Sequence, residues 1–372
     1  MTSSDIADVV VLGDGLVGLS CARAVAARGH SCVLVGRHRI GAASGAAAGL
    51  IAPTVDPARG AALAFTVAAR DRYASFLDEL RGATGHDVPL ALDGILRLPK
   101  DERDVRAMAG DDTAASRWLS SDDVAALEPA LLAPFGARFH PRDARVDNRR
   151  LLQALNAAIA LADLPRVEAD AVRLEMADVH ATVELDSGRR IRTAHVVVAT
   201  GAWAPYLNGL PRPLPVRPLR GQMMALATPT HLPHPLTRPV FGHGGYLVPR
   251  PLEQQVLVGS TSETVGFTTG TTDAALAGFR RLAGRLVPAL ARADEARSWS
   301  GFRPMTLDGL PIIGLDPEAP ALVYACGHSR NGILLAPLTG DVVAALISGD
   351  PPSHDLTPFS PSRFVPQTRA LS

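Results

Sequence analysis

The feature that most constrains the fold of this chain is the stretch VVVLGDGLVG at residues 9–18, where an apolar run leads directly into a Gly-x-Gly-x-x-Gly motif. The run is typical of a buried parallel strand, and the small residues at 16–27, followed by Gly29, predict a helix. A second apolar run at 31–35 predicts the next strand. Strand, glycine turn, helix and strand together indicate a dinucleotide-binding unit.

The glycine turn is the predicted pyrophosphate site. Glycines let the backbone approach a pyrophosphate closely, and a helix N-terminus directs free N–H groups and a positive dipole end toward it. We assign the pyrophosphate to the following residues: Gly13, Gly15, Leu16, Val17 and Gly18.

One part of the dinucleotide pattern is missing. An acid usually ends the second strand and accepts hydrogen bonds from the adenosine ribose, but this chain has Gly36 there, followed by Arg37. An arginine at this place suits a 2′-phosphate and hence NADP. Alternatively, backbone groups or neighbouring side chains such as Arg37 hold the ribose, with some loss of FAD affinity.

Composition excludes several classes of function. Lys plus Arg and Asp plus Glu balance at 37 each without a block of like charge, so we expect no nucleic-acid or membrane partner and a small ligand instead. The three cysteines have no C-x-x-C spacing, so neither a disulfide framework nor a metal site is expected. Without a signal-like N-terminus or a membrane-spanning apolar stretch, the expected location is cytoplasmic.

A chain of 372 residues is too long for one small core, so we expect two intertwined domains. Apolar periodicity predicts helices at 66–81, 121–128, 151–162, 273–286 and 340–347, and strands at 195–199, 222–227, 246–249, 256–259 and 322–325. The predicted fold class is α/β, a discontinuous Rossmann-like domain of the glutathione-reductase type with an α+β substrate domain on a mostly antiparallel sheet. The cofactor domain is predicted at 1–85, 140–215 and 301–372, and the substrate domain at 86–139 and 216–300.

Several separated stretches resemble one family. They are VVVLGDGLVGLSCA, GAASGAAAGLIAP, VVVATGAWAP, GYLVPR, VGSTSETVGF, GFRPMTLDGLPIIG and GHSRNGILLAPLTG. Their order and spacing resemble the D-amino-acid oxidase superfamily of FAD-dependent amine oxidases, and within it the glycine oxidases of thiamine biosynthesis. The resemblance covers nearly the whole chain and favours FAD over NADP.

The resemblance implies further contacts to noncovalent FAD. Ser44 is a candidate hydrogen-bond donor, although a serine that only begins a helix is equally compatible with the sequence. The other implied contacts are Gly49, Leu50, Val172, Thr200, Gly201, Trp203, Gly327, Arg330, Asn331, Gly332, Ile333 and Leu334. Thr200 and Gly201 also fit an ordinary turn after a strand. Cys326 lacks the family context for a covalent flavin.

The resemblance also implies a substrate site. Arg303 corresponds to the arginine that binds the substrate carboxylate, and a planar fork of donors suits a planar anion. Tyr246 corresponds to the tyrosine that orients the same carboxylate, and Arg330 to an arginine near the flavin. Ser262 replaces a methionine, and Ser329 an aromatic residue, of close glycine oxidases. Both changes predict a roomier, more polar pocket and an amine larger or more polar than glycine.

The implied reaction is hydride transfer from a small amino acid or amine to flavin, with hydrolysis of the imine and O2 as acceptor. No His–Asp or Ser–His pair is required, and His243 and His328 are candidates only for tuning the pocket. The sequence leaves two alternatives open, a dehydrogenase that uses another acceptor and a non-catalytic dinucleotide-binding protein. The resemblance also implies a homo-oligomer.

Overall fold

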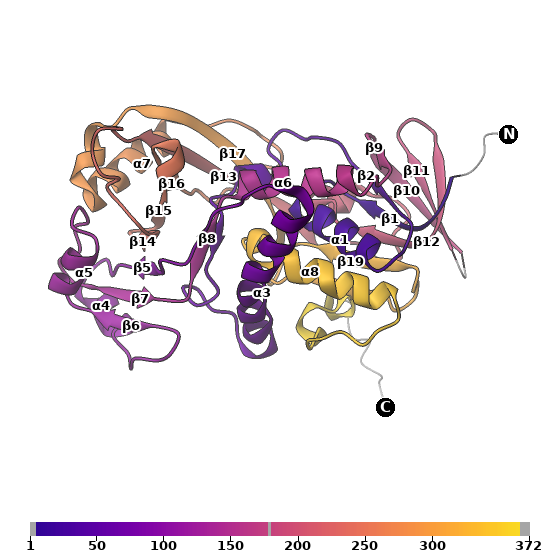
Figure 1. The fold of residues 1–372 in the computed structure, drawn as a ribbon, viewed down its shortest axis with the longest axis horizontal. Coiled ribbons are helices and arrows are strands. Elements are labelled where there is room, and N and C mark those ends of the chain that lie inside the picture. Colours follow the sequence, from indigo (N-terminus) through magenta and orange to yellow (C-terminus); the bar gives the residue numbers. More distant parts are fainter. Residues whose placement is uncertain (1–4, 178–179, 365–372) are drawn as a thin grey trace.

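The computed structural model describes residues 5–177 and 180–364, which form two large sheets and one small sheet (Figure 1). The first sheet has the order β10-β11-β12-β1-β2-β9, and β19 joins β12 to β18. Its strands are β1 (Asp5–Leu12), β2 (Cys32–Val35), β9 (Arg166–Val167), β10 (Ala171–Met176), β11 (Ala181–Leu185), β12 (Arg190–Val198), β18 (Ile312–Leu315) and β19 (Leu322–Cys326). β1 pairs in parallel with both β2 and β12, as a dinucleotide-binding sheet requires.

The alternation of side chains along β1 divides the core of this domain between the two faces of the sheet. Val9 and Val11 pack into the cluster that four helices cover, whereas Val10 and Leu12 pack on the opposite face. The covering helices are α1 (Leu16–Ala27), α3 (Gly60–Thr84), α6 (Asn148–Leu161) and α8 (Gly332–Ile347). In Figure 1, α8 lies against α1 and α3.

The second sheet has the order β17-β13-β16-β15-β14-β5-β7-β6, and every pairing in it is antiparallel except that of β14 with β5. Its strands are β5 (Ile95–Arg97), β6 (Arg117–Leu119), β7 (Ala137–His140), β13 (Val216–Ala227), β14 (Val240–Gly242), β15 (Gly245–Arg250), β16 (Gln255–Gly259) and β17 (Glu295–Thr306). Helix α7 (Asp273–Leu286) packs on it through Phe279, Ala283 and Leu286. The predicted fold class is therefore confirmed, while the domain boundaries stay a prediction.

Short elements link the two large sheets. A small sheet combines β3 (Leu50–Ile51), β8 (Ala144–Val146) and β4 (Leu90–Ala91). The remaining helices are α2 (Ala43–Ala46), α4 (Glu102–Met108) and α5 (Ser121–Leu127), together with short 3-10 turns such as η1 (Gly201–Tyr206). None of the helices in the described part of the chain has both the length and the apolarity to cross a membrane.

The last helix corrects a prediction. It was expected from residue 340, but α8 begins at Gly332 and contains Pro337. Proline has no N–H to donate to the carbonyl four residues earlier, which is that of Ile333. The Tyr73 hydroxyl donates to this oxygen at 2.5 Å from inside α3, so the interrupted hydrogen bond is replaced by one between helices. The glycines and the proline at 327–340 predict a turn. The sequence does not reveal the helix, because Tyr73, which replaces the missing hydrogen bond, lies 260 positions before Ile333.

Candidate functional site

A cavity of about 1600 Å³ extends from the glycine turn to the second sheet. Its volume exceeds the roughly 300–1,000 Å³ of ordinary ligand pockets, which suits a dinucleotide together with a small substrate. All the predicted site residues line it except Gly18 and Leu334. Leu334 is instead buried in the core beneath the helices.

The glycine motif accepts only glycine at two positions, one in the turn after β1 and one in the first turn of α1. Gly13 has φ of +110°, and a Cβ there would lie 2.3 Å from the carbonyl oxygen of Ala199. A Cβ on Gly18 would lie 1.8 Å from the carbonyl oxygen of Gly13. The first turn of α1 has no acidic side chain, so its N–H groups form an electropositive end that fits a phosphate.

The segment at 43–50, from α2 to the start of β3, runs along the cavity and is held by hydrogen bonds and close contacts. Ser44 Oγ accepts a hydrogen bond from Leu16 N at 3.0 Å, which ties this loop to the start of α1. Gly49 has φ of +75°, and a Cβ there would lie 2.0 Å from Val146 O. Leu50 follows at the start of β3 and also lines the cavity. At Gly49 this segment therefore has no room for a larger side chain.

Two residues that the sequence analysis did not identify hold this loop. The buried Arg250 donates to Ala48 O at 2.9 Å, to Val146 O at 3.1 Å and to Asn148 Oδ1 at 2.9 Å. Asn148 in turn donates to Ser44 O at 2.8 Å. Burial lowers the pKa of Arg250. Arg250 stands in the quoted stretch GYLVPR, but no local signal in the sequence connects it with residues about 100 positions earlier.

Strand β12 ends at Val198, and Thr200 and Gly201, which follow it, line the cavity. The Thr200 hydroxyl is buried and has no hydrogen-bond partner within the described residues, although it lies at the cavity wall. A buried polar atom without a partner is costly, and a ligand that supplies one removes the cost. This atom and the glycine cradle together fit a polar dinucleotide in the cavity.

Aromatic residues close the same wall. Trp203 stacks on Phe267 with ring centroids 4.9 Å apart, and the Arg39 guanidinium lies 5.0 Å from the Trp203 ring. Further along the cavity, Val172 lies at a bulge of β10, where its carbonyl already accepts hydrogen bonds from Asn208. Trp203 and Val172 therefore form parts of the cavity wall.

The turn between β19 and α8 brings a second helix N-terminus to the cavity. Gly327 and Ser329 have φ of +67° and +52°, and Asn331, Gly332 and Ile333 line the cavity where the helix begins. His328 is buried, and desolvation lowers its pKa to about 3, so it is neutral. Burial raises the pKa of the Cys326 thiol to about 12, which keeps it protonated.

Arg303 is a cation without a counterion. It projects from β17, donates to Thr261 O at 3.1 Å and Ser260 Oγ at 2.6 Å, and has a pKa lowered by desolvation. A Cβ on Gly221 would lie 2.4 Å from the guanidinium, so glycine makes room for it. Among residues 5–177 and 180–364, no carboxylate lies within 4 Å of it. Such an arrangement suits an anionic ligand, because buried charges are normally paired.

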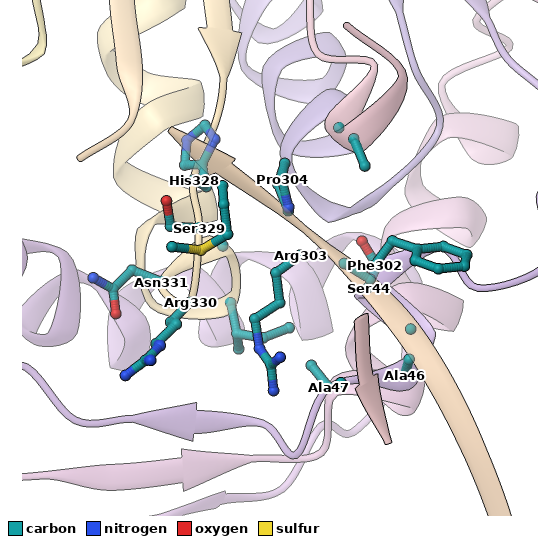
Figure 2. Close-up of a pocket in the computed structure, with 18 of the residues that line it drawn as sticks. Ser44, Ala46, Ala47, Phe302, Arg303, Pro304, His328, Ser329, Arg330 and Asn331 are labelled. Atoms are coloured by element: carbon teal, nitrogen blue, oxygen red, sulfur yellow. The ribbon is translucent and has the colours of Figure 1, made fainter. Parts of the chain in front are cut away.

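The other predicted substrate residues line the same cavity as Arg303. Tyr246 donates from its hydroxyl to Met223 Sδ at 3.3 Å. Arg330 is largely exposed, with Nη1 3.9 Å from Asp56 Oδ2, and Figure 2 shows it extending toward the same part of the pocket as Arg303. Ser329 is buried and donates to Gly327 O, whereas Ser262 is exposed at the cavity edge. In the described residues no three His, Cys, Asp or Glu side chains gather as metal ligands would.

Comparison with known proteins agrees with this geometry. The model of the family described as DAO, FAD dependent oxidoreductase, matches residues 8–346. The bifunctional protein ThiO/ThiG of Nostoc sp. is 36% identical over 98% of this chain, but the chain spans only 56% of that relative. Glycine oxidase of Geobacillus kaustophilus is 32% identical over 96% of this chain and 97% of its own length.

A solved structure gives the same result for the fold. The crystal structure of glycine oxidase from Geobacillus kaustophilus superposes with a TM-score of 0.89 and 30% identity, covering 97% of this chain and 100% of that one. The match includes both large sheets, because it spans nearly the whole chain. The chain therefore belongs to the DAO family of FAD dependent oxidoreductases.

Proposed function

We propose that this protein oxidises a small primary or secondary amino acid, such as glycine or sarcosine, with FAD. The observation that carries the proposal is the unpaired Arg303 guanidinium in the cavity that the glycine turn and the α8 N-terminus also line. Its hydrogen bonds to Thr261 O and Ser260 Oγ use one N–H of each terminal nitrogen, so the guanidinium keeps donors for a carboxylate. The names of the glycine oxidase relatives support the same substrate class.

Each part of the site has a proposed task. FAD, when bound, supplies the capacity to take a hydride from the substrate carbon. Arg303 binds the substrate carboxylate, and Tyr246 and Arg330 border the same space, so the amine end is directed along the cavity. His328 is neutral and its Nε2 lies 3.1 Å from the Thr339 hydroxyl, so it contributes shape and no charge.

The substrate preference is a finer proposal. Ser262 stands at the cavity edge, and Ser329 turns its hydroxyl to Gly327 O, so neither fills the space that methionine and an aromatic residue fill in close glycine oxidases. We expect an amine larger or more polar than glycine. Relative kcat/KM for glycine, sarcosine, D-alanine and an aminophosphonate tests this, and a clear preference for glycine refutes it.

The remaining expectations belong to the same proposal. They are noncovalent FAD, O2 as acceptor, a role in thiamine biosynthesis, a cytoplasmic location and a homo-oligomer. The buried, protonated Cys326 thiol supports noncovalent binding, since the thiolate is the reactive form.

The first experiment is the visible spectrum of the purified protein, followed by anaerobic addition of glycine, sarcosine and small D-amino acids. A yellow protein that one of these amines bleaches supports the proposal. Readmitted air then separates an oxidase, whose colour returns, from a dehydrogenase, whose colour does not. A colourless protein that binds no added FAD contradicts the proposal.

A further inference from the structure

The place where the ribose acid is missing is already occupied by another acid. Gly36 directly follows β2, and its N–H donates to Val167 O at 3.1 Å. A Cβ on Gly36 would lie 2.9 Å from both the Cβ and the backbone nitrogen of Asp14. The Asp14 side chain therefore lies where a side chain at position 36 would begin, and the two positions cannot both carry an acid without a shift.

The Asp14 carboxylate is held in place and still has a free oxygen. Its Oδ2 accepts a hydrogen bond from Arg166 Nη2 at 2.8 Å, and its side chain is 19% exposed. Arg166 belongs to β9, the strand next to β2, so the ion pair fixes the carboxylate beside the end of β2. Within the described residues no donor reaches Oδ1, and Asp14 lines the cavity together with Gly36 and Arg37.

The neighbouring arginines are paired with acids. Arg37 Nη2 lies 2.5 Å from Asp186 Oδ2, and Arg37 Nε lies 3.6 Å from Asp170 Oδ2. Arg39 Nη2 lies 2.7 Å from Asp170 Oδ1. With the Arg166–Asp14 pair, each of these three arginines has an aspartate within 4 Å. A 2′-phosphate would meet no surplus of positive charge, whereas ribose hydroxyl groups need only an acceptor.

We propose that Asp14 performs in this chain the role of the acid that is missing at Gly36, and that its carboxylate accepts hydrogen bonds from the adenosine ribose of FAD. The inference rests on the FAD part of the proposed function and not on the amine chemistry. That Arg37 contacts the cofactor stays a prediction, since Arg37 lines the same cavity.

Whether Asp14→Asn weakens or tightens FAD binding distinguishes a hydrogen bond to the ribose from a general effect of charge. Asp14 and the pyrophosphate of FAD are both negative, so if Asp14 acted only through its charge, Asp14→Asn would tighten FAD binding. If the carboxylate accepts hydrogen bonds from the ribose hydroxyl groups, the same variant weakens FAD binding, because hydrogen bonds to a charged group are among the strong ones. The amide keeps the size of the side chain.

The test is a titration of the full chain, freed of flavin, with FAD, followed by tryptophan fluorescence. We expect Asp14→Asn to raise the Kd for FAD by about tenfold or more. The matched control is Asp186→Asn, which removes a negative charge from the same corner and is expected to leave the Kd within about twofold or to lower it. An unchanged or lower Kd for Asp14→Asn overturns the proposal.

A second ligand distinguishes recognition from a merely structural role. An FAD analogue whose adenosine ribose lacks both hydroxyl groups should bind the unaltered protein less tightly than FAD, while Asp14→Asn should bind the two ligands nearly equally. If Asp14→Asn weakens both ligands by the same factor, Asp14 only shapes the turn and the proposal fails.

A rescue variant covers the case in which Asp14→Asn does not fold. Asp14→Glu keeps a carboxylate at this position, whereas Asp14→Ala removes it, and neither variant adds a side chain at Gly36, where a Cβ would meet the backbone nitrogen of Asp14 at 2.9 Å. We expect Asp14→Glu to bind FAD more tightly than Asp14→Ala, and the reverse order contradicts the proposal. Loss of FAD binding by the unaltered chain would instead refute the proposed function, and loss of amine oxidation alone would leave the titrations valid.

Discussion

Arg303→Met provides the most direct test of the proposed carboxylate site. A bidentate pair between the guanidinium and a carboxylate comprises two charge-assisted hydrogen bonds of about 1.5–3 kcal/mol each, and their loss amounts to about 3–6 kcal/mol. This corresponds to a fall in kcat/KM of roughly 10²- to 10⁴-fold for an amino acid. Desolvation lowers the pKa of Arg303, as expected of a buried cation that has no carboxylate within 4 Å among the described residues.

The assay compares glycine or the preferred amino acid with the corresponding amide, which lacks the negative charge. The unaltered enzyme should favour the acid strongly, and Arg303→Met should remove most of this preference. Arg303→Lys retains the charge but not the planar fork, so its kcat/KM should be intermediate. Thermal unfolding serves as the control, because replacing an unpaired cation by an apolar side chain should leave Tm equal or higher. Equal losses for the acid and the amide, or a lower Tm that accounts for the loss, would refute the reasoning.

Two further predictions concern the scaffold. Gly49→Ala places a side chain at φ of +75° and close to Val146 O, so the free energy of unfolding should fall by at least about 1 kcal/mol. The control is Gly82→Ala, inside α3 with open space around it, which should leave the free energy of unfolding unchanged or raise it. Urea denaturation measures both variants, and equal effects would contradict the structure. The pKa of His328 is about 3 in the folded protein and near 6.5 in the unfolded chain. Between these two pH values the unfolded chain binds a proton that the folded protein does not, so the free energy of unfolding decreases as the pH falls from 6.5 toward 3. The loss amounts to about 3 kcal/mol at pH 4. Tm measured from pH 7 to pH 4 should therefore fall less steeply for His328→Gln, and parallel curves would show that His328 is not responsible.

Local signals were sufficient to predict much of the fold. Helix α1 has the predicted ends, and so does α7, whose Thr272 side chain caps it. Helix α5 begins at the predicted residue 121, after a capping box between Ser120 and Asp123. In contrast, α6 begins three residues before the predicted start, after a cap from Asp147 that apolar periodicity does not reveal. The fold class could be predicted from the order of glycine turn, helix and strand, because each of these three signals lies within a short stretch of sequence.

The site could be predicted only in part. The resemblance brought Tyr246, Arg303 and Arg330 together as candidates, and all three line the cavity. The support beneath them could not be predicted, because Arg250 meets Asn148 across 102 positions, and Asp14 meets Gly36 only after β1 and β2 pair. Contacts of this kind depend on tertiary packing, for which one sequence carries no local signal.

The hydrogen bond between Tyr73 and Ile333 makes two distant positions depend on one another during evolution. While Pro337 is present, a change of Tyr73 to phenylalanine leaves a buried carbonyl without a donor. Once Pro337 has given way to a residue with an N–H, the helix satisfies that carbonyl itself and Tyr73 becomes free to vary. The order in which these two substitutions arise thus decides whether a lineage passes through a less stable intermediate, although both end points are well packed.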